Sequence, residues 1–224
     1  GDVYKRQSMD SKVDVEQFVN DGIADLVAHE VGHTIGLRHN FKGSSIHTLE
    51  QLQNTSLTNK EGLTGSVMDY NPVNIAPKGK PQGHYYHKTL GAYDYWAIEY
   101  AYMPYDPSGK ESEAAMLERI AGKAADPLLT YGTDEDTQGS GWGIDPRSTR
   151  YDMTADPISY FKHRFGLSKE LWASLEKNFE KDGERYTKLR SVFGQGIGEY
   201  YTSMLSIPKY VGGLYHHRDH IGDK

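Results

Sequence analysis

A pair of histidines four residues apart, with a glutamate directly after the first, constrains this chain more than any other feature of its sequence. Residues at this spacing lie on one face of an α-helix, so His29 and His33 can converge on a single cation while Glu30 lies beside them. The residues before the pair have the apolar spacing of three and four that predicts such a helix. They are Val15, Phe18, Val19, Ile23, Leu26 and Val27.

The expected ends of this helix follow from the residues that flank it. Asp10 or Ser11 is the predicted N-cap, and Gly36 is predicted to end the helix in a left-handed turn. Such a turn brings the chain back and carries His39 toward the same cation. Three imidazoles bind zinc with a fourth position left open, which is the arrangement of a catalytic zinc site. A charged helix face with ordinary hydrogen-bonded histidines is the alternative interpretation.

The amino-acid composition limits which residues can bind a metal and which classes of partner the chain can have. The chain has ten His and no Cys, so a metal must be held by imidazole, carboxylate or carbonyl groups. The 224 residues include 25 Lys and Arg against 31 Asp and Glu, and a net charge of −6 argues against nucleic-acid binding. No apolar run approaches the ~20 residues of a membrane-spanning helix, so we expect no membrane span.

A second motif lies downstream, at Ser66-Val67-Met68-Asp69-Tyr70. Together with His29–His39 it resembles the metzincin clan of zinc endopeptidases, which pair HExxHxxGxxH with a methionine-containing turn (the Met-turn) beneath the metal. The resemblance extends over roughly Val13–Met103 and includes a closing helix at Leu90–Tyr102. It is greatest to large, poorly characterised bacterial zinc-dependent metalloproteases.

This resemblance implies a zinc-dependent endopeptidase that hydrolyses a peptide or protein substrate. Its Zn²⁺ ligands would be His29, His33 and His39. Glu30 would be the general base, which takes a proton from a zinc-bound water and passes it to the leaving amine.

Three further residues support the site in this interpretation. Gly36 makes the return bend, Met68 forms an apolar floor, and Tyr70 stands where astacins and serralysins have a tyrosine that reaches the metal. The Tyr70 hydroxyl would then donate a hydrogen bond to the oxyanion of the transition state. Packing in a tyrosine-rich core is the alternative for Tyr70. Asn40 leaves the subfamily open, because better-known subfamilies have Glu or Pro after the third His.

Three regions are expected along the chain: a tail over 1–10, a metzincin-like zinc-binding region over 11–106 and a helical C-terminal region over 107–224. The predicted fold class is mainly α, namely the C-terminal half of a zincin-like core with a helical extension. Metzincins have a β-sheet before the active-site helix, and only 28 residues precede His29. We therefore expect the upstream sheet of the parent α+β fold to be missing and the fragment to hydrolyse peptides poorly alone. The upstream part of the parent chain is then an expected partner, and the resemblance implies an extracytoplasmic location.

Apolar spacing and proline positions predict the later helices. We expect helices at Gly91–Met103, Glu111–Ala125 and Leu189–Leu205. Pro157 is placed in the first turn of another helix, and Ser168 is expected to cap a further one.

Weaker signals come from the other polar clusters. His84 and His87 are expected to be exposed in the loop after the Met-turn. The acidic loop 134–145 loosely resembles a calcium loop, but its flanks do not have helical spacing, so a solvated acidic loop is the favoured interpretation. Three C-terminal histidines are expected at the surface: His216, His217 and His220.

Two rival functions remain open from the sequence. One is a non-catalytic, zinc-organised binding or structural module, and the other is a hydrolase that acts on a non-peptide amide. Glu30 and Tyr70 argue against the first, because a structural zinc site requires neither an adjacent base nor an open coordination position.

Overall fold

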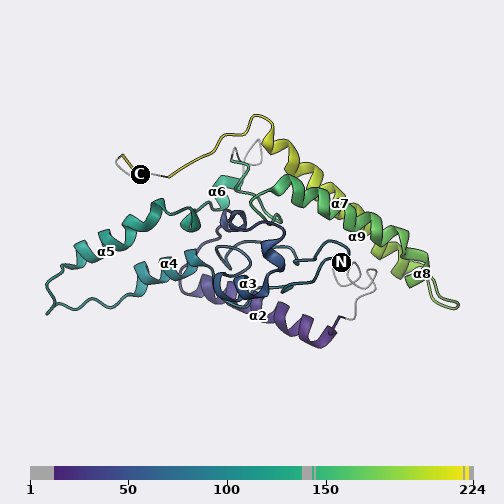
Figure 1. The fold of residues 1–224 in the computed structure, drawn as a ribbon, viewed down its shortest axis with the longest axis horizontal. Helices are drawn as coiled ribbons and strands as arrows, with labels where there is room; N and C mark the ends of the chain where they lie inside the picture. Colours follow the sequence, from purple (N-terminus) through teal and green to yellow (C-terminus); the bar gives the residue numbers. More distant parts are fainter. Residues whose placement is uncertain (1–12, 138–142, 144, 219, 222–224) are drawn as a thin grey trace.

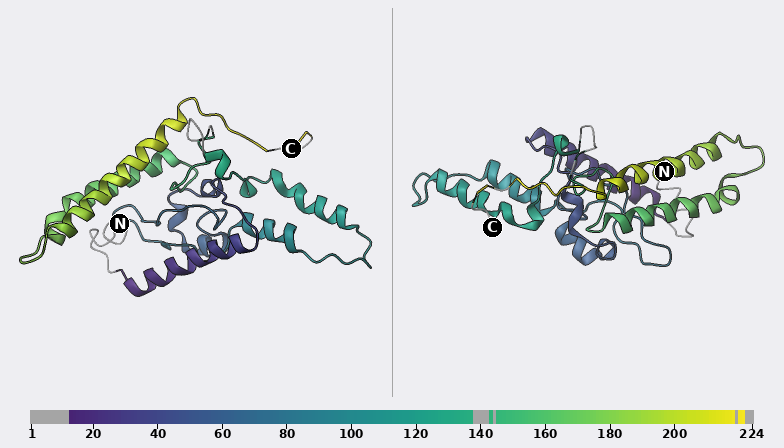
Figure 2. Two further views of the ribbon diagram at one scale, coloured as in Figure 1. Left: turned by 180° about the vertical axis from the view of Figure 1, so that it is seen from behind. Right: turned by 90° about the horizontal axis from the view of Figure 1, so that it is seen from above.

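The computed structural model of the chain describes residues 13–137, 143, 145–218 and 220–221. Within these residues the protein is mainly helical and has no β-strand. Figure 1 shows a loop-rich centre flanked by α2 (Val15–Thr34), with two helical arms that extend in opposite directions, and Figure 2 shows the same arrangement from two further sides. One arm contains α4 (Ala92–Tyr102) and α5 (Glu113–Ala121), and the other contains α7 (Pro157–Ala173), α8 (Leu175–Phe179) and α9 (Thr187–Ser206).

Short helical segments make up much of the rest. They are η1 (Gly43–Ile46), η2 (Gln51–Gln53), α3 (Thr55–Glu61), η3 (Gly122–Ala125), η4 (Pro127–Leu129), α6 (Asp134–Thr137) and η5 (Ile207–Tyr210). Every helix of the described stretches is too short or too polar to cross a bilayer.

The helix α2 begins at Val15, the first residue of the apolar spacing, and thus after the caps that the sequence predicts. Its N-cap is Asp14, whose Oδ1 accepts a hydrogen bond of 3.0 Å from the backbone N–H of Gln17. The predicted caps, Asp10 and Ser11, lie outside the described residues. The predicted end is confirmed: Gly36 has φ +94°, the left-handed conformation that favours glycine.

The buried face of α2 is not its aliphatic one. Phe18, His29 and Gly32 are the buried residues of the helix, and Phe18 packs edge-on against two tyrosine rings of the 85–86 loop at 5.1 Å. The aliphatic residues that predict the helix are exposed, with Val19, Ile23 and Leu26 between 48% and 59% accessible. The spacing therefore predicts the helix correctly, but its aromatic and histidine-bearing face packs on the centre.

One core cluster joins the loop-rich centre to the C-terminal arm. Leu52 and Leu63 of the centre pack with Met153, Tyr160 and Phe161, which belong to the start of α7 and the segment before it. Burial of these apolar side chains fixes residues 145–156 along the centre.

In the C-terminal arm, α7 and α9 pack together. Asp156 caps α7 and Pro157 opens its first turn, as predicted. Ser168 does not cap a new helix: it is buried inside α7, which continues because Leu171 packs with α8 and α9. Gly196 lets α9 approach closely, since a Cβ there would lie 2.4 Å from Trp172 Nε1. This close packing explains why α9 persists despite its three glycines.

Candidate metal centre

Three histidines converge at the centre of the molecule. One nitrogen each from His29, His33 and His39 lies within 4.8 Å of the other two. The rings of His29 and His33 are 4.7 Å apart between centroids, and the His39 ring lies 4.7 Å from that of His33. The sequence prediction that the return bend brings His39 to the first two is thus met.

Each of these imidazoles is held by its Nδ1 atom. His29 Nδ1 donates to the carbonyl of Val67 at 2.8 Å, and His33 Nδ1 donates to the carbonyl of Leu37 at 2.9 Å. His39 Nδ1 lies 3.0 and 3.1 Å from the two carboxylate oxygens of Asp134. Because carbonyl and carboxylate oxygens accept, Nδ1 is the donor in each ring, and Nε2 is the atom of the Nδ1–H tautomer that can bind a metal.

The free lone pairs fit a metal ion. His39 Nε2 is buried and has no hydrogen-bond partner, which is costly unless a ligand satisfies it. Three imidazole nitrogens with their second nitrogens fixed by carbonyl and carboxylate groups form the donor set that binds Zn²⁺ in catalytic sites.

The helix α2 and the Met-turn pack closely against each other beside the histidine cluster. A Cβ on Gly32 would lie 2.2 Å from Sδ of Met68, which is fully buried. The backbone of Met68 accepts a hydrogen bond of 3.1 Å from the N–H of Asn40, next to the third histidine. Met68 thus packs against α2 beside His33, while its neighbour Val67 orients His29.

An aspartate of α4 holds the Met-turn in place. Asp94 is buried and accepts hydrogen bonds from Ser66 Oγ at 2.6 Å, the N–H of Val67 at 2.8 Å and the N–H of Gly91 at 2.9 Å. Burial raises the pKa of Asp94, and these hydrogen bonds lower it by less. The sequence interpretation overlooked this residue, although an aspartate at the third position of a predicted helix is a recognisable capping signal.

Tyr70 lies against the histidine cluster. Its ring centroid is 4.6 Å from that of His39 and 5.6 Å from that of His29. Its backbone carbonyl accepts a hydrogen bond of 3.0 Å from the N–H of Tyr151, whose ring stacks on it. Glu30 is exposed on α2 directly after His29.

In its described residues, 134–137, 143 and 145, the acidic loop is not the solvated loop that its composition suggests. Asp145 is buried and pairs with Lys42 and Arg147, each at 2.9 Å. Burial alone would raise the pKa of Asp145, but hydrogen bonds from these two cations hold it well below its usual range. Asp136 binds Arg218 at 2.7 Å, and Asp134 binds His39.

Two buried carboxylates, Asp69 and Asp152, stand next to Tyr70 and Tyr151 in the sequence. Asp69 Oδ2 accepts a hydrogen bond of 3.0 Å from the N–H of Ser44, and Asp152 follows the residue that is bonded to the Tyr70 carbonyl. Burial raises the pKa of both carboxyl groups, and the charge of Asp152 raises that of Asp69 further. These raised pKa values favour the protonated form of both groups more than in exposed carboxylates.

The remaining histidines separate into buried and exposed ones. The prediction that His87 is exposed is wrong: it is buried and hydrogen-bonded to Thr64 Oγ1 at 3.0 Å. His84 is half-buried, and burial lowers its pKa. The three C-terminal histidines are exposed, as predicted, and line a hollow of about 560 Å³ together with Tyr93 and Tyr131.

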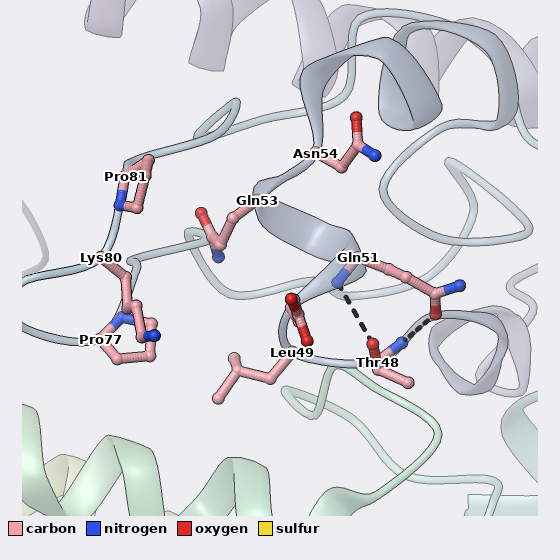
Figure 3. A pocket seen from close by; sticks show the side chains of 9 residues that line it. Thr48, Leu49, Gln51, Gln53, Asn54, Pro77, Lys80 and Pro81 are labelled. Atoms are coloured by element: carbon pink, nitrogen blue, oxygen red, sulfur yellow. Dashed lines mark hydrogen bonds between the residues drawn. The ribbon is translucent and has the colours of Figure 1, made fainter.

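A second hollow of about 700 Å³ lies beside η2, between Thr48 and Pro81 (Figure 3). Thr48 and Gln51 face each other there and exchange two hydrogen bonds, at 2.8 and 3.2 Å. Glu50 and Lys80 are the charged residues among those that line it. The chemistry of metal binding therefore belongs to the histidine cluster and not to this hollow.

Comparison with known proteins agrees with this geometry. A family model described as Met-zincin matches residues 11–224, which extends the likeness well beyond the two motifs into the C-terminal arm. No curated protein and no solved structure gives a significant match. Since the matched stretch spans nearly the whole sequence and contains the three convergent histidines, the chain belongs to the Met-zincin family.

Proposed function

We propose that this protein is a zinc-dependent endopeptidase. The observation that carries the proposal is the convergence of His29, His33 and His39, whose ligand atoms lie within 4.8 Å of one another. Membership of the Met-zincin family supports the same activity. When bound, Zn²⁺ would polarise the scissile carbonyl of a peptide and lower the pKa of a coordinated water.

The neighbouring residues of the chain would handle the protons of this reaction. The Glu30 carboxylate stands next to the first ligand and is exposed, so it would accept a proton from the attacking water and donate it to the leaving amine. Tyr70 packs against two of the three imidazoles, and its hydroxyl would donate a hydrogen bond to the oxyanion. Glu30 would thus serve the attacking water and the leaving amine, and Tyr70 would serve the carbonyl oxygen that becomes negatively charged.

The test separates metal binding from turnover. Zinc-loaded protein is incubated with a pool of unstructured peptides, and cleavage is followed by mass spectrometry with and without a chelator. Glu30→Gln should bind zinc as well as the wild type does but lose about 10²-fold or more in rate, the contribution typical of general acid–base catalysis. Tyr70→Phe should lower the rate with unchanged zinc affinity.

Glu16→Gln is the matched control, since Glu16 is another exposed glutamate of α2 that lies in its first turn, remote from the histidines. It should cleave at the wild-type rate. Cleavage by Glu30→Gln at the wild-type rate would refute Glu30 as the base. Because the fragment is expected to cleave slowly, the incubation is prolonged. Zinc-loaded protein that still cleaves no faster than the chelator-treated sample, or cleavage that survives removal of the metal, would refute the peptidase itself.

A further inference from the structure

The third histidine of the cluster differs from the other two in its partner. His29 and His33 donate to neutral backbone carbonyls, whereas His39 donates to a carboxylate that lies 95 residues further along the chain. We propose that Asp134 is a positioning residue for the metal, which fixes the His39 ring so that its Nε2 faces the other two ligands. This inference rests on the metal site of the proposed function.

The His39 Nδ1 atom lies at nearly equal distances from the two carboxylate oxygens of Asp134. His39 Nδ1 lies 3.1 Å from Oδ1 and 3.0 Å from Oδ2 of Asp134, so both oxygens share the proton. The two side chains are 17% and 29% exposed, which leaves little water to compete for this hydrogen bond. A carboxylate partner orients a ligating imidazole, fixes its tautomer and makes the opposite nitrogen a stronger electron donor. The unpartnered Nε2 of His39 is the atom that this contact would direct to a metal.

Asp134 is itself held on two sides. Arg150 donates to its Oδ1 at 3.3 Å, and the Arg38 guanidinium lies 3.9 Å from its Oδ2. Arg38 is anchored in turn by Glu135, whose two oxygens each accept a hydrogen bond of 2.8 Å from the same nitrogen. The contacts with the two arginines limit the rotation of the carboxylate.

The backbone next to Asp134 is pinned to the residues that follow His39. Asn40, which is fully buried, donates to the carbonyl of Thr130 at 3.0 Å and accepts from the N–H of Gly132 at 3.2 Å. The N–H of Phe41 donates to the carbonyl of Gly132 at 2.6 Å. These bonds fix the start of α6 against the third ligand, so Asp134 cannot drift away from His39 without breaking them.

Zinc affinity, measured by competition with a chromogenic chelator, is the first test. Asp134→Ala should weaken zinc binding about 10- to 100-fold, the range observed when the outer partner of a ligating histidine is removed. Glu135→Gln is the control, because Asp134 keeps its contact with His39 in this variant. The exposed Arg38–Glu135 ion pair contributes little, so zinc affinity should change by no more than about threefold. Asp134→Asn keeps the size and one acceptor oxygen and should fall between these two.

A second measurement reports on the ring without metal. In apo-protein labelled with ¹⁵N on histidine, NMR should show His39 as the Nδ1–H tautomer in the wild type and in Glu135→Gln. Asp134→Ala should show a mixture of tautomers, with circular dichroism unchanged. If Asp134→Ala unfolds the protein, the same comparison is made with Asp134→Asn, for which a partial loss of the Nδ1–H form is expected.

Folded Asp134 variants with wild-type zinc affinity and an unchanged His39 tautomer would overturn the assignment. Because neither measurement depends on turnover, failure of the peptidase proposal would leave this result interpretable. Loss of peptide cleavage by Glu30→Gln without a change in affinity would, conversely, say nothing against Asp134.

Discussion

The contact between Gly32 and Met68 allows a sharp test of how the floor of the metal centre is built. Substitution of Gly32 by Ala adds a methyl group that would lie 2.2 Å from Sδ, 3.2 Å from Cε and 3.7 Å from Cγ of Met68. Carbon and sulfur atoms in contact are normally separated by about 3.5–4.0 Å, so the Met68 sulfur must move by more than 1 Å. Met68 is fully buried, and its backbone is bonded to Asn40, so the side chain has little room.

Two opposing terms set the magnitude. Overpacking of a closed core typically costs about 1–3 kcal/mol, while alanine in a helix interior is favoured over glycine by about 0.5–1 kcal/mol. Gly32→Ala should therefore lower the free energy of unfolding by about 0.5–2 kcal/mol, measured on apo-protein by urea denaturation. Zinc affinity should fall as well, since the displaced turn carries the Val67 carbonyl that orients His29.

A double-mutant cycle isolates the cause. Met68→Ala removes all three atoms that the new methyl group would meet, so in that background Gly32→Ala should stabilise the protein by about 0.5–1 kcal/mol. Gly166→Ala in α7, where a Cβ meets no atom within 4 Å, is the control and should be stabilising in either background. Equal loss of stability from Gly32→Ala with and without the Met68 side chain would refute the packing argument.

Two further predictions concern buried carboxylates. Asp94→Ala leaves three buried donors unpaired, including the Val67 N–H, and should lower the free energy of unfolding by about 3 kcal/mol or more in urea; a loss below about 1 kcal/mol would contradict this. Asp152 and Asp69 hold protons in the folded state that the unfolded chain releases, so the free energy of unfolding should decline as the pH rises above about 4. Asp152→Asn should flatten this decline and make the protein more stable than the wild type at pH 8, and an unchanged slope would exclude the pair as its cause.

Much of the metal centre is local in sequence, which is why it is predictable. The helix, the histidine spacing and the left-handed Gly36 all lie within the run that ends at His39, and each follows from backbone geometry. Both ends of α4 and the start of α7 follow in the same way from a flanking proline or a capping side chain.

The features that escape prediction depend on pairing between distant segments. Asp134 lies in a loop whose composition loosely resembles that of a calcium loop. Nothing near it in the sequence indicates that it bonds a histidine 95 residues away. The buried state of His87 depends likewise on its contact with Thr64 in the loop before the Met-turn. The exposed aliphatic side of α2 shows that periodicity identifies a helix without identifying which side packs inward.

The long separation between His39 and Asp134 also has a consequence for the newly made protein. At translation rates of about 5–20 residues per second, the third histidine leaves the ribosome roughly 5–20 s before its carboxylate partner. Throughout that interval the two helix-borne imidazoles are already available to metal ions, whereas the His39 ring turns without a fixed orientation. Maturation of the centre therefore awaits synthesis of the segment that carries Asp134, and a nascent chain stalled between these two positions would hold zinc only loosely.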